Sequence, residues 1–149
     1  MIDNKKSRSQ SDTGSRMPTK SASGQTILIV EDELPLLKVY ADRFSEEGFS
    51  VLKASNGEVG LDLAIKEQPD LILLDILMPV MDGLTMMQKL RENNTWGKTV
   101  PIILLTNLSA DEKKIKKIVS ENRPAYYLVK LDWSLSAIIE KAKMAVLVQ

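Results

Sequence analysis

The feature that most constrains this chain is a short apolar run that ends in a carboxylate. Residues 71–74 read Leu-Ile-Leu-Leu, with Asp70 before them and Asp75 after them, and the turn-forming Pro79 and Gly83 follow. Such a run predicts a strand buried on both faces, as in the middle of a parallel sheet. Asp75 would then stand at the carboxyl end of a central strand, the edge at which open α/β sheets form ligand sites. A lone aspartate there more often only caps a turn, so the other strand ends decide its role.

From Thr26 onward, strand-like runs alternate with segments whose apolar residues recur at helical spacing. The strand-like runs lie at residues 27–30, 50–54, 71–75, 100–105 and 126–129. The helical segments are expected after Glu33, from Asn56, from Gly83, from a capping box at Ser109 and from about Asp132. Five such β-then-α units predict an α/β fold with a doubly wound, five-stranded parallel sheet. The flavodoxin-like strand order 2-1-3-4-5 matches the number of units.

Composition divides the chain into a tail and one domain. Its 149 residues, of which 44% are hydrophobic, are enough for a single packed core. Residues 1–25 are rich in serine and poor in large apolar side chains, so they cannot bury enough surface to offset the entropy cost of ordering. We expect a disordered, mildly basic tail over residues 1–25 and a folded domain over residues 26–149.

Charge and residue usage exclude several classes of function. Lys plus Arg and Asp plus Glu each total 20, so no overall charge favours nucleic acid or an anionic membrane. The sequence has no cysteine and no histidine, which excludes thiolate metal sites, His-ligated zinc and imidazole catalysis. It also lacks a signal-peptide pattern and any run of about 20 apolar residues. We expect a cytoplasmic protein that binds neither nucleic acid nor membrane.

Polar side chains stand at the ends of four of the expected strands. Glu31 and Asp32 follow the first strand, Asp75 ends the third, Thr106 ends the fourth, and Lys130 follows the fifth. The carboxyl ends of parallel strands share one edge of the sheet. We therefore expect three carboxylates, a hydroxyl and an ammonium to converge there.

This set of groups suits phosphoryl chemistry. Carboxylates gathered without histidine suit a hard cation, and Mg²⁺ commonly binds through one or two carboxylates, waters and a phosphate. Without the cation the carboxylates repel one another, which raises at least one pKa. Asp75 can attack a phosphoryl group to give an acyl phosphate. Thr106 can donate a hydrogen bond to one phosphoryl oxygen, and Lys130 can hold another.

In this order, these residues resemble the receiver domain of response regulators in two-component signalling. The matching motifs are the pair Glu31-Asp32, the segment around Asp75 that runs to Gly83, Thr106 after Leu104-Leu105, and Lys130 after Tyr127-Leu128-Val129. The resemblance covers about residues 26 to 148. It implies the flavodoxin-like receiver fold, of which the chemotaxis regulator is an example.

The resemblance also implies a metal site. Asp75 would be both the phosphoacceptor and, with Asp32, a ligand of Mg²⁺. Glu31 would contribute an outer-sphere or water-mediated contact. Leu77 would add its backbone carbonyl to the metal.

The remaining implied roles concern the phosphoryl group and the output. Thr106 and Lys130 would bind the phosphoryl group, and Thr106 and Tyr127 would act as switch residues. The donor would be a histidine kinase or a histidine phosphotransfer protein, since this sequence has no histidine. Only 19 residues follow Lys130, so we expect no output domain after it. Signalling would then use the domain's own surface, through effector binding or self-association at the face formed by the helix after Ser109, the strand at 126–129 and the last helix.

Two positions depart from the family pattern, and two others bear on the lifetime of the phosphorylated state. Leu131 stands where a cis proline commonly follows the lysine. A cis bond without proline costs about 3–4 kcal/mol, so we expect a trans bond and a shifted path into the last helix. Asn107 replaces a very small residue and either narrows access or adds a hydrogen bond. The resemblance also implies that Leu77 and Leu108 would flank the approach of the hydrolytic water. Neither side chain can hydrogen-bond that water, which predicts slow dephosphorylation.

Other phosphate-handling classes fit the sequence less well. A haloacid-dehalogenase-type phosphatase needs a second aspartate two residues after its nucleophile, where this chain has Leu77. The first strand lacks the glycine-rich continuation of a P-loop or a dinucleotide-binding fold. The remaining alternative is a pseudo-receiver, an interaction module without phosphate turnover. Such modules usually lack part of the acidic pair, aspartate and lysine set, which is complete here.

Overall fold

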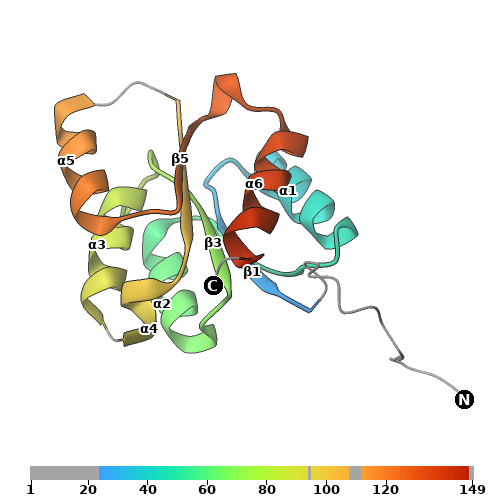
Figure 1. The fold of residues 1–149 in the computed structure, drawn as a ribbon, viewed down its shortest axis with the longest axis horizontal. Helices are drawn as coiled ribbons and strands as arrows, with labels where there is room; N and C mark the ends of the chain where they lie inside the picture. Colours follow the sequence, from blue (N-terminus) through green and yellow to red (C-terminus); the bar gives the residue numbers. More distant parts are fainter. Residues whose placement is uncertain (1–23, 94, 108–111, 148–149) are drawn as a thin grey trace, which may run out of the picture.

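The computed structural model describes residues 24–93, 95–107 and 112–147, and Figure 1 shows their path. Five strands form one parallel sheet in the order β2-β1-β3-β4-β5. They are β1 (Thr26–Val30), β2 (Ser50–Ala54), β3 (Leu71–Asp75), β4 (Ile102–Thr106) and β5 (Tyr126–Val129). The predicted α/β class, doubly wound architecture and strand order are confirmed. The tail predicted for residues 1–25 lies, up to residue 23, outside the described residues.

Helices cover both faces of the sheet. They are α1 (Leu34–Glu46), α2 (Gly57–Glu67), α3 (Gly83–Asn93), α4 (Thr95–Thr99), α5 (Glu112–Asn122) and α6 (Leu135–Leu147), with a 3₁₀ helix, η1, at Lys130–Asp132. The helices α1 and α6 pack on one face, and α2, α3 and α5 pack on the other (Figure 1). To span a bilayer, a helix would have to be longer and more apolar than any that the structure describes.

The central strands are apolar at successive positions because each of their faces meets helices. In β1, Ile27 and Ile29 join the cluster under α1 and α6, whereas Leu28 and Val30 join the cluster under α2, α3 and α5. The strand β3 divides its side chains in the same way, and its first four residues are at most 1% exposed. The last residue of that buried strand is the carboxylate Asp75.

The helix signals in the sequence mostly correspond to observed contacts. The side-chain Oδ1 of Asn56 accepts a hydrogen bond of 2.9 Å from the backbone N–H of Val59, so Asn56 caps α2 as predicted. Gly48 follows α1 with a φ of +102°, a conformation that favours glycine at the end of a helix. The buried face of α1 is formed by Leu37, Tyr40, Ala41 and Phe44, which recur at helical spacing.

The short helix α4 was not predicted, because its sequence has no apolar periodicity. Tertiary contacts hold it instead. The buried part of the Arg91 guanidinium donates hydrogen bonds to the backbone oxygens of Gly97, at 2.9 Å, and Val100, at 2.8 Å. Trp96 packs against the core below.

The last helix begins later than the sequence predicted. The 3₁₀ helix η1 occupies the connection from β5, and α6 begins at Leu135 rather than near Asp132. The described residues contain no cis peptide bond, so the bond before Leu131 is trans as predicted. The capping box expected at Ser109 lies outside the described residues, except for the backbone of Glu112 at the start of α5.

Candidate functional site

The carboxyl edge of the sheet brings the predicted polar residues together. Glu31 and Asp32 follow β1, Asp75 ends β3, Thr106 ends β4, and Lys130 follows β5. The register places Asp75 opposite Leu105, and Thr106 opposite Val129. Parallel pairing without bulges therefore delivers residues far apart in the sequence to one edge.

Three carboxylates form the acidic part of the site. Glu31, Asp32 and Asp75 each offer an oxygen, and these oxygens lie within 4.8 Å of one another. Glu31 is 1% exposed and Asp75 is 4% exposed, whereas Asp32 is only partly buried. Like charges held this close and out of water need a cation among them.

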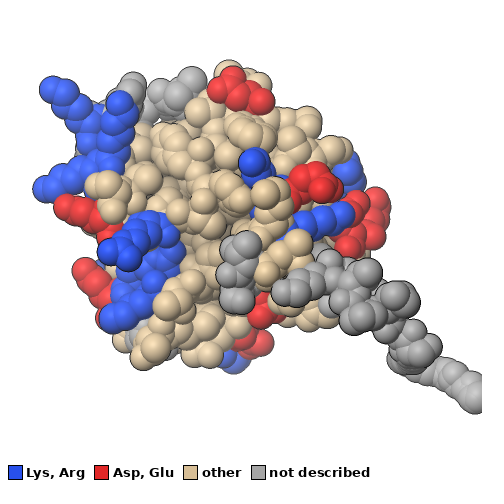
Figure 2. All heavy atoms as spheres, viewed as in Figure 1, with Lys and Arg blue, Asp and Glu red and all other residues tan. Residues whose placement is uncertain are grey.

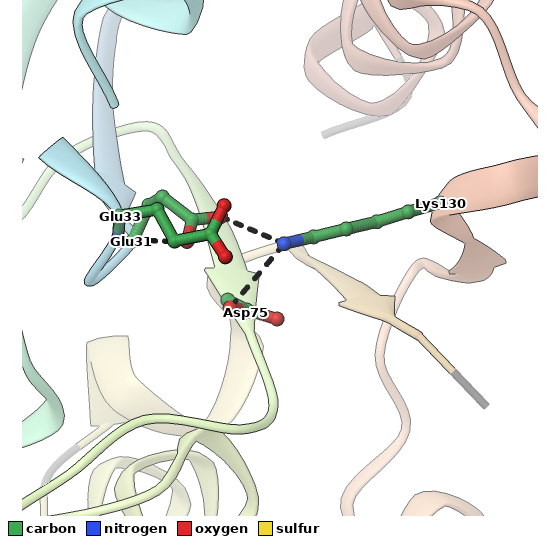
Figure 3. Close-up of polar contacts among 4 residues, drawn as sticks. All are labelled: Glu31, Glu33, Asp75 and Lys130. Carbon is green, nitrogen blue, oxygen red and sulfur yellow. Dashed lines mark hydrogen bonds and ion pairs between the residues drawn. The ribbon is translucent and has the colours of Figure 1, made fainter. Parts of the chain in front are cut away.

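Lys130 is the cation that the structure supplies. Its Nζ lies 2.9 Å from Glu31 Oε1 and 3.3 Å from Asp75 Oδ2, as Figure 3 shows. The other oxygen of Glu31 accepts a hydrogen bond of 3.1 Å from the backbone N–H of Glu33. Glu31 is thus fixed from two sides, and Lys130 connects it to Asp75.

The buried charges of the site shift the pKa values of Asp75 and Lys130. Burial and the neighbouring Glu31 carboxylate raise the pKa of Asp75 to about 7, although the Lys130 ammonium opposes the shift. Burial by itself would lower the pKa of Lys130. The hydrogen bond that its ammonium donates to Glu31 and the charges of Asp75 and Glu31 outweigh burial, so the pKa of Lys130 is raised. The lysine stays charged at neutral pH, while the charge on Asp75 depends on its neighbours.

The donor set fits a hard divalent cation. All three clustered side chains offer carboxylate oxygens, the ligand type that Mg²⁺ prefers. A cation among them would also lower the raised pKa of Asp75. Leu77, whose carbonyl is the fourth predicted ligand, lies two residues beyond Asp75, and the residue is 42% exposed. The role of that carbonyl stays a prediction.

The predicted switch residues lie on β4 and β5. Thr106 is fully buried at the end of β4. Tyr127 lies opposite Leu104 in the register and packs, partly buried, against the cluster under α2, α3 and α5. Asn107 is exposed, so it does not fill the site as a core side chain, and Leu108 lies outside the described residues.

One residue beside the site was not singled out by the sequence. Tyr40, on the inner face of α1, is 5% exposed. Burial raises the pKa of its phenol, the Lys130 charge lowers it, and the Glu31 and Asp75 charges raise it further. Tyr40 therefore lies within electrostatic reach of the site. In the sequence it is one apolar position of an amphipathic helix, and nothing distinguishes it from a leucine.

Comparisons with known proteins show the family to which the fold belongs. A family model described as the response regulator receiver domain matches residues 27–143. The protein described as probable transcriptional regulator ycf27 of Guillardia theta is 42% identical over 84 residues, which are 56% of this chain and 32% of that protein. The sensor histidine kinase TmoS of Ectopseudomonas mendocina is 34% identical over 116 residues, 78% of this chain and 12% of that protein. The chain thus spans well under half the length of these curated relatives.

Solved receiver structures share the fold over most of their length. The receiver domain of the Francisella response regulator 1452 has 26% sequence identity and a TM-score of 0.70, with 83% of this chain and 97% of that one covered. The chemotaxis response regulator CheY4 of Vibrio cholerae has 25% identity and a TM-score of 0.71, with 81% and 98% covered. Together with the family match over most of the chain, these likenesses show that the chain belongs to the response regulator receiver domain family.

Proposed function

We propose that this domain accepts a phosphoryl group on Asp75 from a phosphohistidine, with Mg²⁺ as its cofactor, and signals through its own surface. The observation that carries the proposal is the position of Lys130, whose Nζ lies 2.9 Å from Glu31 and 3.3 Å from Asp75 inside the cluster of carboxylates. A structural salt bridge needs one carboxylate. Here three carboxylates cluster and one ammonium contacts two of them, which leaves negative charge for a metal ion to balance.

The chain's own groups have distinct tasks in this transfer. An oxygen of the Asp75 carboxylate attacks the phosphorus, the phosphorus–nitrogen bond breaks, and its electron pair stays on the donor imidazole. Lys130 moves its ammonium from Asp75 to a phosphoryl oxygen, and Thr106 donates its hydroxyl hydrogen to another. Asp32, Asp75, the Leu77 carbonyl and, through water, Glu31 would hold Mg²⁺, which would supply positive charge beside the phosphoryl group. The sequence contains no histidine, so the donor belongs to a histidine kinase or phosphotransfer protein.

Intact-mass measurement with a small acyl-phosphate donor tests the proposal. Wild type should gain one phosphoryl group in the presence of Mg²⁺ and much less in the presence of a chelator. Asp75→Asn keeps the size of the side chain but removes the nucleophile, and it should gain none. Equal labelling of wild type and Asp75→Asn, or no labelling of either, would instead support a pseudo-receiver, the interaction module without phosphate turnover.

The proposed output surface consists of α5, β5 and α6. Thr106 and Tyr127 would connect it to the site, because Thr106 ends β4 and Tyr127 lies on the neighbouring strand β5, opposite Leu104. Phosphorylation would shift an existing two-state equilibrium of this surface and so change effector binding or self-association. Figure 2 shows Lys and Arg gathered over the side of the molecule where α5 lies, and Lys113, Lys116 and Lys117 are exposed on that helix. A change at α5 would therefore change a charged surface.

Amide chemical shifts test this coupling. A phosphoryl mimic such as beryllofluoride, added with Mg²⁺, should move amide signals in α5, β5 and α6 as well as in the site. Shifts confined to the site would contradict the coupling. In Tyr127→Ala, a switch role predicts that the remote shifts are lost, whereas a packing role predicts lower stability with the remote shifts retained.

A further inference from the structure

The loop between β3 and α3 is held in a strained conformation beside the site. Val80 has a φ of +70°, which is unfavourable for a β-branched residue. The N–H of Met81 donates a hydrogen bond of 2.8 Å to the carbonyl of Pro79, which closes a tight turn over Val80. The N–H of Gly83 donates a hydrogen bond, also of 2.8 Å, to the carbonyl of Ile76 and closes the loop. Such a turn persists only when its surroundings hold it.

The first turn of α2 supplies that support. Gly57 begins α2, and its N–H donates a hydrogen bond of 3.1 Å to the carbonyl of Met81. A Cβ on Gly57 would lie 2.3 Å from that carbonyl oxygen and 2.9 Å from its carbon. Both are backbone atoms, which cannot turn aside as a flexible side chain can. A glycine at this position is therefore what allows the helix to approach and bond the loop.

We propose that Gly57 is a positioning residue for the phosphoacceptor site, because it anchors α2 to the loop that carries the backbone carbonyl of Leu77. This inference rests on the proposed function, since the position of that carbonyl matters only if the site holds Mg²⁺. The hydrogen bond from Gly57 holds the carbonyl of Met81, which is the fourth residue after Leu77. The hydrogen bond between Gly83 and Ile76 joins the two ends of this loop. A displacement of Met81 is thus transmitted along a short, strained backbone toward Leu77 and Asp75.

Gly60 provides a matched control on the same helix. It is buried, as Gly57 is, and a Cβ there would also meet close neighbours. Those neighbours are side-chain atoms, Met86 Sδ at 3.0 Å and Val30 Cγ2 at 3.0 Å, and not the backbone of the loop. Gly60→Ala should therefore disturb packing under α2 while the loop keeps its position.

The test compares wild type, Gly57→Ala and Gly60→Ala by calorimetric Mg²⁺ titration and by amide shifts of the metal-free proteins. Gly57→Ala should weaken Mg²⁺ binding about tenfold, at the low end of what loss of outer contacts costs a metal site. Without metal it should move the amide signals of residues 76–83. Gly60→Ala should leave the Mg²⁺ dissociation constant and those amide signals unchanged, even where urea unfolding shows that it is the less stable variant.

Other results would contradict either the positioning role of Gly57 or the proposed binding of Mg²⁺. If wild type and Gly57→Ala bind Mg²⁺ equally, or if both alanine variants lose affinity alike, Gly57 is only a packing residue and the proposed function stands. If wild type binds no Mg²⁺, the proposed metal role fails and the inference fails with it. Should Gly57→Ala not fold, Asn56→Ala loosens the same first turn by removing its cap, and Asn56→Ser restores a capping oxygen. Equal Mg²⁺ affinity in these two variants would overturn the positioning role.

Discussion

One aspartate, Asp70, precedes β3, and another, Asp75, is its last residue. Both stand next to the same apolar run in the sequence, but their surroundings in the structure differ. At the amino end, Asp70 Oδ2 accepts a hydrogen bond of 2.8 Å from the backbone N–H of Thr26. At the carboxyl end, Asp75 faces two further carboxylates and the ammonium of Lys130. Asp70 thus ties the start of β3 to the start of β1, whereas Asp75 is held among like charges.

The difference shows how environment assigns a role to a carboxylate. A carboxylate that accepts a hydrogen bond from a backbone N–H satisfies that donor and so contributes to folding. A carboxylate buried beside another carboxylate is destabilised in its charged form, and it becomes stable when a cation arrives. Asp75 therefore costs the folded protein stability in exchange for reactivity, which is typical of functional sites.

The largest expected effect is a difference in phosphorylation between variants of the two aspartates. Asp70→Asn should be phosphorylated at nearly the wild-type rate, because it lies at the opposite edge of the sheet from the site. Asp75→Asn should not be phosphorylated at all, since the nucleophile is gone. The time course of phosphoprotein formation, followed by mass, measures both. Comparable losses in both variants would contradict the assignment of separate roles.

The second prediction concerns stability and its dependence on pH in the absence of metal. The pKa of Asp75 is raised in the folded state, from an ordinary value of 3.8 to about 7. Between these values the folded protein binds a proton that the unfolded chain has released, so Asp75 lowers the free energy of unfolding as pH rises from about 4 to 7. The full shift would correspond to roughly 4 kcal/mol. Solvent screening at this partly open site reduces the effect, so Asp75→Asn should be more stable than wild type by about 2 kcal/mol at pH 8.

Urea unfolding of both proteins from pH 4 to pH 8 measures this difference. The advantage of Asp75→Asn should be near zero at pH 4, grow up to pH 7 and then stay constant. A difference between Asp75→Asn and wild type that does not change with pH would contradict the raised pKa.

The third prediction concerns the lifetime of the phosphoryl group on Asp75. Asp70 is not expected to carry a phosphoryl group, so this prediction applies to Asp75 alone. Leu77 and Leu108 cannot align a water for attack, so the double variant Leu77→Asn, Leu108→Glu should dephosphorylate about tenfold faster, which corresponds to roughly 1.4 kcal/mol of barrier. Loss of phosphate from the purified proteins after removal of the donor measures it. Unchanged or slower loss in the double variant would mean that the leucines do not shield the site.

The smallest expected effect is a change in folding stability when Asp70 is replaced. Asp70→Ala removes the acceptor for the Thr26 N–H and should lower the free energy of unfolding by about 1 kcal/mol, with phosphorylation intact. Equilibrium unfolding in urea at pH 7 provides the measurement. A phosphorylation defect in Asp70→Ala, without a change in stability, would contradict the purely structural role.

The sequence was sufficient for the sheet and for the meeting of the site residues. Apolar runs marked the strands, and parallel topology obliged Glu31, Asp32, Asp75, Thr106 and Lys130 to share one edge. The three carboxylates and Lys130 do lie together. This part was predictable because it depends on strand ends, which local pattern and chain connection determine.

Features that depend on tertiary contacts were not predictable. The helix α4 exists because Arg91 and Trp96 hold it, and neither is a helix signal. The pairing of Lys130 with Glu31 depends on side-chain positions across the sheet. In the sequence, Gly57 is an ordinary residue after a helix cap. Its contact with the carbonyl of Met81 is visible only in the structure.

The central claim is that Asp75 and no other carboxylate of this chain becomes an acyl phosphate. Borohydride reduces an acyl phosphate of aspartate to homoserine, which can then be located by peptide mass spectrometry. After phosphorylation with Mg²⁺ and reduction, homoserine should be found at position 75, and its yield should fall when Mg²⁺ is chelated. Homoserine at position 32 or 70, or none at position 75 in a protein that has gained phosphate, would contradict the account.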